Sequence, residues 1–254
     1  MAKKTEMNAQ KSETLVPTSG YAALANNAVL SDISEELTGL TLHYARVKKA
    51  SAASLDFELP VENGELEYIR ELRGVIVFNH PANSFYAEAY TGGNNPPDCG
   101  SYNGVTGSTG EACKTCPMNV FGSGQGNSKA CKQKRMAYFL LEGELFPLLF
   151  CIPTASLKAF TEYLTRLLSK GLRLNQVVTK ITLKKTTSSS GIPYSQCVFM
   201  FERLLDKSEQ AAIAPIIEQA KAYAAGLTVT QMGQITEDGS EAGAPVANDV
   251  TPLT

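Results

Sequence analysis

The stretch that most constrains how this chain can fold is residues 92–131. It is rich in Gly, Asn, Pro and Ser and has hardly any aliphatic residues. A segment of about 40 residues with this composition cannot bury an apolar core of its own, so it needs another source of stability or stays unfolded. It contains four cysteines, which are spaced Cys99-x13-Cys113-x2-Cys116-x14-Cys131.

This cysteine spacing predicts one structural zinc site. Zinc binds four ligands tetrahedrally, with sulfur at about 2.3 Å, and a CxxC pair brings two thiolates to one metal from a tight turn. Gly110 and Pro117 lie on either side of the pair and suit such a turn. Because four thiolates leave no open position for water, we expect the metal to stabilise the segment rather than to take part in catalysis.

Other roles for the cysteines stay open at the level of sequence. The four could form disulfides, although a reducing compartment argues against that. A redox CxxC is less expected, because no amphipathic helix follows the pair. His80, at the end of a predicted strand, could replace one cysteine as a ligand or could be an ordinary surface residue. Cys151 and Cys197 lie in apolar segments and are expected to be buried thiols.

Length and composition predict a folded cytoplasmic protein. The chain has 254 residues, of which 43% are hydrophobic and 19% charged, enough for one large domain or a domain with an insertion. No apolar run approaches the length of about 18 residues that indicates a transmembrane helix. The lysines near the N-terminus are not followed by an apolar segment, so a secretory signal is not expected.

Charge is divided unevenly along the chain. Every Lys and Arg lies at or before Lys221, and only Glu237, Asp238, Glu241 and Asp249 are charged after it. With those four acids set aside, 21 acidic residues face 23 basic ones, so the body is only mildly basic. Local clusters of basic residues must therefore carry any argument for nucleic-acid binding.

Composition predicts three regions. Residues 1–30 are polar and lack a sustained period, which indicates a flexible N-terminal arm. Residues 31–225 are expected to fold, with the zinc-binding insertion at 92–135. Residues 226–254 are rich in Gly, Pro, Ser and acids and are expected to form a flexible acidic tail.

Periodicity predicts a mainly β or α+β fold. Strands are expected at 68–79, 84–90, 136–141, 145–152, 176–185 and 194–203, with Pro147 marking an edge or a break. Helices are expected from Thr154 or Ser156 to about 168, and over 207–225. A helix between the third and fourth barrel strands is the arrangement of an OB-fold. The expected fold is an OB-fold-like barrel with an inserted zinc subdomain and a C-terminal helix, although other small α+β sheets give the same order.

Basic and aromatic residues near the cysteines are candidates for DNA contact. Lysine and arginine side chains neutralise phosphates, and exposed aromatic rings stack on unpaired bases. Any single lysine is more often a solvated surface residue, so the prediction depends on their grouping. Phe85, Phe139, Phe199 and Phe201 are expected in the core instead. The predicted contact residues are Lys114, Lys129, Lys132, Lys134, Arg135, Lys180, Lys184, Tyr86, Tyr102, Phe121 and Tyr138.

The residues PPDCGSYNGVTG…CKTCPMNVFGSGQGNSKACKQKR, followed by a strand and LFPLLFCIPTASLKAFTEYL, resemble a family of phage and mobile-element proteins. The resemblance covers roughly residues 70–205, and it implies single-stranded DNA binding in replication and recombination. The layout is also similar to that of T4-type single-strand binding proteins, in which a zinc subdomain is inserted into an OB-fold and an acidic tail follows. Those proteins use one His and three Cys, whereas four Cys are present here.

The leading hypothesis is a non-enzymatic protein that binds single-stranded DNA without sequence preference. It implies Zn²⁺ as cofactor, contacts with replication or recombination proteins through the acidic tail, homo-oligomers on DNA, and a location in the host cytoplasm if a phage encodes the chain. The alternative is a zinc-bearing adaptor through which a phage factor binds a host enzyme. An enzyme is not expected, because the sequence has no phosphate loop, nucleophile elbow or His-acid metal motif.

Overall fold

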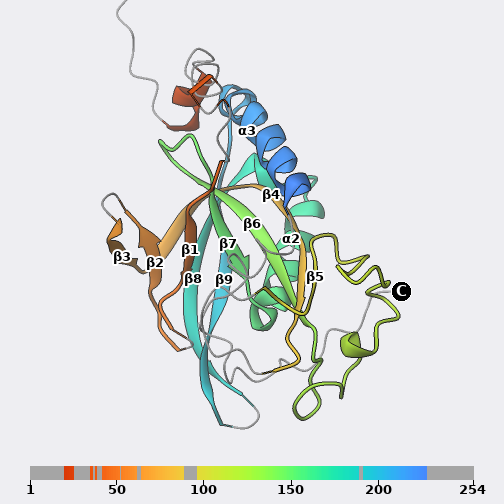
Figure 1. Ribbon diagram of the computed structural model, residues 1–254. Helices are drawn as coiled ribbons and strands as arrows, with labels where there is room; N and C mark the ends of the chain where they lie inside the picture. Colours follow the sequence, from red (N-terminus) through yellow and green to blue (C-terminus); the bar gives the residue numbers. More distant parts are fainter. Residues whose placement is uncertain are drawn as a thin grey trace, which may run out of the picture.

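The computed structural model describes residues 20–25, 35–36, 38, 42–51, 53–61, 64–88, 96–188 and 191–227. Over these residues the protein is mainly β. One sheet curls into a half-barrel, and the described chain ends in a helix (Figure 1). The prediction of a barrel-like, mainly β fold with a C-terminal helix is therefore confirmed. The predicted tail lies outside the described residues, apart from its first two.

The strands in this part of the chain are β1 (Arg46–Lys49), β2 (Phe57–Pro60), β3 (Leu66–Ile69), β4 (Glu71–Phe85), β5 (Cys99–Ser101), β6 (Lys132–Leu141), β7 (Leu148–Ile152), β8 (Val177–Thr187) and β9 (Pro193–Leu204). The α-helices are α2 (Leu157–Leu168) and α3 (Lys207–Gly226), and the 3-10 helices are η1 (Gly20–Ala25), η3 (Pro117–Asn119), η4 (Thr154–Ser156) and η5 (Leu174–Gln176). Hydrogen bonds join the strands in the order β3-β2-β1-β7-β6-β4-β8-β9, and β5 pairs with the end of β4. These pairs are antiparallel except for β1 with β7.

β4 is the longest of the described strands and pairs with β6 on one side and β8 on the other. Its 15 residues pair with β6 from Gly74 to Ser84 and with β8 over residues 71–74. Residues 75–77, in the middle of the strand predicted over 68–79, are buried in β4. A separate strand over 84–90 is not confirmed, because β4 continues through Ser84, which pairs with β6, to Phe85, which pairs with β5. Residues 87–88 form a bend, and residues 89–90 lie outside the described residues.

Helices cover both faces of the sheet. Along β6, Met136, Tyr138 and Leu140 belong to the core cluster shared with α3, whereas Ala137 and Phe139 belong to the cluster shared with α2. Successive side chains of a strand point to opposite faces. β6 is therefore buried on both sides, which explains its continuous apolar run.

The curl brings β9 close to η4 and to β1, although neither is its neighbour in the pairing order. The backbone N–H of Cys197 on β9 donates to Oγ of Ser156, 3.0 Å away. The ammonium of Lys49 on β1 donates to the carbonyl oxygen of Ser195 on β9, at 3.4 Å. These contacts bring the two sides of the half-barrel together.

The closing helix predicted over 207–225 is confirmed as α3. Its start is a capping box: the Asp206 carboxylate accepts from the N–H of Glu209 at 2.9 Å, and the Glu209 carboxylate accepts from the N–H of Asp206 at 3.0 Å. Glu209 also accepts two hydrogen bonds, of 2.7 and 2.8 Å, from the Arg203 guanidinium. Among the described residues, no helix is both long and apolar enough to cross a bilayer.

The N-terminal region differs from the predicted flexible arm over 1–30. Residues 20–25 form η1, in which Tyr21 is fully buried. Its hydroxyl donates to the carbonyl oxygen of Leu140 at 3.0 Å. Tyr21 and Leu24 are its buried residues, and a segment of six residues is too short for an amphipathic period that a sequence pattern could reveal. The remainder of the predicted arm lies outside the described residues.

Three strands, β1, β2 and β5, have no counterpart among the predicted elements. Each has three or four residues, which is too short for a clear period of two. The strand predicted over 68–79 begins in β3 and continues, after Arg70, into β4. The predicted helix near 154–168 is present as η4 followed by α2, and β7 begins directly after Pro147. Strand character in short segments depends on their neighbours in the sheet, which a local pattern does not contain.

Candidate metal centre and nucleic-acid interface

The cysteine-bearing segment lies between β4 and β6 and projects from one end of the sheet (Figure 1). β5 anchors it, because Cys99 pairs with Phe85 at the end of β4. Cys131 directly precedes β6 at the other end of the segment. Cys113 and Cys116 lie in the loops between, where Cys116 immediately precedes η3.

Turn chemistry shapes the loop around the CxxC pair. Gly110 has a φ of 86°, a conformation that strongly favours glycine. The N–H of Cys113 donates to the carbonyl oxygen of Val105 at 2.8 Å. Pro117 occupies the start of η3, where its fixed φ suits a helix beginning. The predicted turn on either side of the CxxC pair is therefore confirmed.

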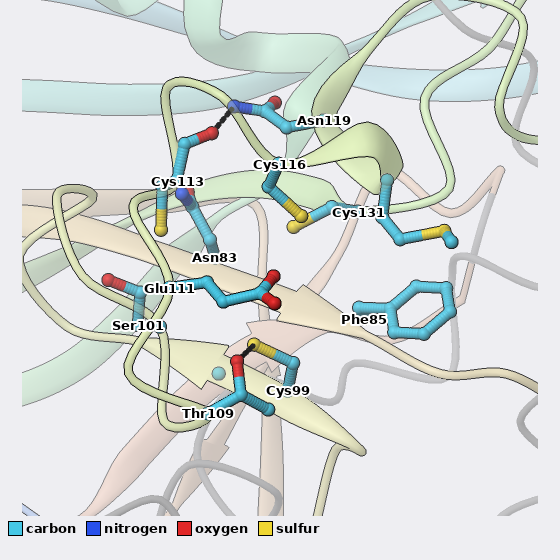
Figure 2. Close-up of a pocket in the computed structure, with 13 residues that line it drawn as sticks. Asn83, Phe85, Cys99, Ser101, Thr109, Glu111, Cys113, Cys116, Asn119 and Cys131 are labelled. Carbon is cyan, nitrogen blue, oxygen red and sulfur yellow. Dashed lines mark hydrogen bonds between the residues drawn. The ribbon is translucent and has the colours of Figure 1, made fainter.

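All four cysteines of the segment line one small cavity (Figure 2). Its volume is about 30 Å³, enough for a guest of the size of a water molecule or a metal ion. The Sγ atom of Cys99 lies 3.8 Å from the hydroxyl of Thr109, which also lines the cavity. Figure 2 shows the side chain of Glu111 extending into the space between Cys99 and the other three cysteines.

The four thiols share this cavity without converging on one point. In the part of the chain that the structure describes, no group of three or more His, Cys, Asp or Glu side chains is placed to hold a metal ion. The four cysteines are free of disulfides. Burial, with smaller contributions from Cys113, Cys116 and Cys99, raises the pKa of the Cys131 thiol to about 11. The donor set and the cavity size suit zinc, but the zinc site itself stays a prediction.

His80 does not line this cavity. It is 8% exposed, and its Nδ1 lies 2.9 Å from the carbonyl oxygens of both Pro81 and Tyr102. Its Nε2 lies 3.3 Å from the hydroxyl of Tyr138. Because both ring nitrogens have hydrogen-bond partners, His80 is not placed to bind a metal. Because the ring is buried, it is not a surface residue either. Cys151 and Cys197 are buried in β7 and β9, as predicted.

Asn119 connects the cysteine loops to the basic residues beside them. Its Nδ2 donates to the carbonyl oxygen of Cys113 at 2.7 Å. Its Oδ1 accepts from the ammonium of Lys129 at 3.2 Å. That ammonium also lies 4.9 Å from the centre of the Phe121 ring. The loop that carries the cysteines therefore also sets the position of Lys129 against Phe121.

Several predicted contact residues are accessible in this segment. Phe121 is 47% exposed, and Lys114, inside the CxxC pair, is exposed as well. Lys129 and Lys132 are half-buried, and the Lys132 ammonium donates to the carbonyl oxygen of Lys129 at 3.1 Å. These four residues of the cysteine segment are called the loop surface below, and contacts within it join Lys129 to Phe121 and to Lys132.

Other predicted contact residues are not available to a ligand in this conformation. Tyr138 is 0% exposed because α3 covers its face of β6, so it belongs to the core and the prediction that it stacks on bases is wrong here. Lys134 is 6% exposed. Arg135 is half-buried, donates to the side-chain oxygen of Asn79, and lies 5.9 Å from the centre of the Phe160 ring.

The remaining predicted residues are spread over other strands and loops. Lys180 on β8 forms an ion pair with Glu71, whereas Lys184 on the same strand is exposed. Tyr86 and Tyr102 are half-buried, and the Tyr102 ring meets His80 edge-on with centroids 5.8 Å apart. Of these, only Lys184 is freely accessible.

The sequence analysis missed three exposed apolar residues of the cysteine segment. Val105 and Val120 are 65% and 56% exposed, and Met118 also lies at the surface next to η3. Their signal is large apolar side chains inside a stretch that has no core to bury them. Met118 and Val120 lie within three residues of Phe121 in the sequence and add exposed apolar area to this loop.

Comparison with protein-family models, with curated proteins and with solved structures finds no match. The function has to be inferred from the geometry of the site.

Proposed function

We propose that the protein binds single-stranded DNA without sequence preference and acts in phage DNA replication or recombination, in the cytoplasm of the bacterial host. The observation that carries the proposal is the loop surface, where the Lys129 ammonium lies over the half-exposed ring of Phe121. Cationic groups beside an exposed ring match what a flexible single strand offers, namely phosphates and unstacked bases.

Each member of the loop surface has a distinct role in this proposal. The ammonium groups of Lys114, Lys129 and Lys132 neutralise backbone phosphates and displace condensed counterions. The Phe121 ring stacks on a base, which contributes about 1–3 kcal/mol and tolerates any base because each has a π face. Since neither contact reads base edges, little sequence preference is expected.

Zinc is proposed as the group that holds the loop surface in place. Cys99, Cys113, Cys116 and Cys131 would be its ligands, and the metal would supply a structural cross-link between β5, the CxxC turn and the start of β6. The shared cavity supports this assignment. So does Gly107, where an added Cβ would lie 2.8 Å from Sγ of Cys99, so that glycine allows the loop to pass close to this thiol.

The finer description of the fold is an OB-fold-like barrel with the cysteine segment as its zinc subdomain. The curled sheet, with α2 between β7 and β8, supports it. The acidic tail is proposed to contact replication or recombination proteins, and the protein to assemble as homo-oligomers along DNA. No enzymatic activity is part of the proposal.

The test is titration of fluorescent oligo-dT and of a matched duplex at two salt concentrations, with zinc content measured on the same sample. We expect tighter binding to the single strand and a steep loss of affinity as salt rises. Equal or tighter binding to duplex, or no binding to either at low salt, contradicts the proposal.

A second candidate is a zinc-bearing adaptor that binds a host enzyme. The exposed Val105 and Val120 favour it, because solvent-facing apolar side chains on a structured loop are typical of protein contacts. Pull-down with wild-type protein and with a Val105→Ser, Val120→Ser variant separates the two candidates. Capture of one host protein that depends on these valines, without DNA retention, favours the adaptor.

A further inference from the structure

A buried lysine, Lys49, lies where β1 meets Ser195 of β9, here called the mouth of the half-barrel, and it has no ion-pair partner within the described residues. Lys49 is 6% exposed, and the one polar contact of its ammonium within the described residues is the carbonyl oxygen of Ser195, at 3.4 Å. The two nearest acids in the chain are engaged elsewhere: Asp56 with Arg70 at 2.7 Å, and Glu58 with Lys48 at 3.0 Å. A buried ammonium with one long hydrogen bond is costly unless an anion compensates it.

Lys185 lies on the same face of the sheet as Lys49. It lies directly opposite Ser195 in the β8–β9 register, and opposite residues of an antiparallel pair point to the same face. Leu183, two residues earlier on β8, belongs to the core cluster under α2, and so does Val47, two residues before Lys49. Alternation along each strand therefore places Lys185 and Lys49 on one face. Lys185 is exposed and, like Lys49, has no ion-pair partner among the described residues.

This mouth lies next to the end of β6 that follows the cysteine segment. Thr154 of η4 donates to the carbonyl oxygen of Gln133 on β6 at 2.6 Å. The next residue, Ala155, accepts from the side-chain amide of Gln196 on β9 at 2.7 Å. η4 therefore lies between β6, which starts at Lys132, and Gln196, the residue after Ser195 on β9. Figure 1 shows the β8–β9 hairpin and the cysteine loops at the same, lower end of the molecule.

We propose that Lys49 and Lys185 form a phosphate-binding site at the mouth of the half-barrel, beside the carbonyl of Ser195. Its ligand is a phosphate group, and continuity with the loop surface across η4 favours a backbone phosphate of the same DNA strand. That part of the inference rests on the proposed function. Lys49 would then be a buried anchor, which contributes to affinity and not to base preference.

The experiment uses full-length Lys49→Met and Lys185→Met variants, with Lys221→Met as a matched control. Lys221 carries the same charge but lies on α3, where it pairs with Glu218 at 2.7 Å. The first measurement is the slope of log affinity for oligo-dT against log salt. Each lost phosphate contact reduces the magnitude of that slope by about 0.7 for a single strand. We expect this reduction for Lys49→Met and Lys185→Met, about twice as much for the double variant, and none for Lys221→Met.

The second measurement needs no DNA. Pyrophosphate, compared with chloride at equal ionic strength, should raise the melting temperature of the wild type and of Lys221→Met, but not of Lys49→Met. Without added anion, Lys49→Met should melt at or above the wild-type temperature, because it removes a buried unpaired charge. A cooperative melting transition of Lys49→Met also shows that this variant folds.

The two measurements separate the possible failures. In one outcome the wild type does not bind oligo-dT, and pyrophosphate raises its melting temperature but not that of Lys49→Met. The proposed function then fails, and the site stands as one for a free phosphate compound. If the melting temperatures change with pyrophosphate as expected, but the salt slope of Lys49→Met equals that of Lys221→Met, the assignment to the DNA backbone is overturned. If Lys49→Met behaves like Lys221→Met in both measurements, the phosphate site is overturned.

Discussion

The Nδ1 atom of His80 lies 2.9 Å from the carbonyl oxygen of Tyr102, and this hydrogen bond ties β4 to the start of the cysteine loops. The carbonyl of Pro81 lies equally close to the same nitrogen. Both oxygens only accept, so Nδ1 carries the proton and Nε2 accepts from the hydroxyl of Tyr138. In this tautomer the neutral ring uses both nitrogens in hydrogen bonds at this junction.

Stability is expected to fall as the pH drops below about 6.5, the ordinary pKa of histidine. Burial lowers the pKa of His80 in the folded protein, so the unfolded chain binds more protons in this range. The free energy of unfolding contributed by His80 is thus complete above pH 6.5 and decreases below it. Urea unfolding between pH 7.5 and 5 measures the effect. His80→Phe should flatten the dependence, and His43→Gln, which changes an exposed histidine, should preserve it. Identical pH profiles for His80→Phe and wild type would sink the idea.

Metal content should depend on the cavity cysteines and not on the buried thiol in β7. We expect about one zinc per chain in the wild type and in Cys151→Ala, and a loss of bound zinc in Cys113→Ser. A chelator should make the loops between β5 and β6 sensitive to protease, because the metal supplies their stability. Native mass spectrometry measures the stoichiometry. A wild-type protein without metal, or equal zinc in both cysteine variants, contradicts the assignment.

Two phenylalanines with nearly equal exposure provide a matched test of stacking. Phe121 is 47% exposed on the loop surface, and Phe201 is 48% exposed on β9, contrary to its predicted place in the core. Phe121→Ala should weaken oligo-dT binding by about 1–3 kcal/mol. Phe201→Ala should leave the affinity unchanged. Fluorescence titration at one salt concentration compares them, and equal losses in both variants would mean that the loop surface is not the contact site.

Gly74 on β4 leaves no room for a side chain against β6. A Cβ added there would lie 2.3 Å from the carbonyl oxygen of Leu140 and 2.8 Å from a ring carbon of Phe139. Because backbone must move to accept it, Gly74→Ala should destabilise the protein by about 3 kcal/mol, at the upper end of overpacking effects. Gly226→Ala is the control, since within the described residues no heavy atom outside its own stretch of helix backbone lies within 4 Å of its Cβ position. Chemical denaturation that finds the two variants equally stable contradicts this account of the sheet.

Local features of the fold were predictable from short segments of sequence. The start of α3 at Asp206 and the turn at Pro117 depend on interactions within a few residues, which a local pattern contains. The placement of four cysteines around one cavity was likewise predictable from their spacing and from the lack of a core in residues 92–131. The apolar centre of β4 was predictable because it is long and continuous.

Features that depend on distant parts of the chain were not predictable. Tyr138 was a candidate for base stacking because alternation along β6 identifies two faces but not what covers them, and α3 covers this one. Lys49 looked like any lysine in a short basic segment, and only the curl of the sheet buries it beside Ser195. The burial of His80 was not predictable for the same reason, because its partners Tyr102 and Tyr138 come from separate segments.

The sequence by itself therefore determined the chemistry that this protein carries: a cysteine set suited to zinc, the presence of its two main helices, and an excess of lysine around the cysteine segment. Only the tertiary structure decided which of those groups face solvent. The physical reason is that burial and the pairing of charges depend on segments brought together by the curled sheet and by helices on both of its faces.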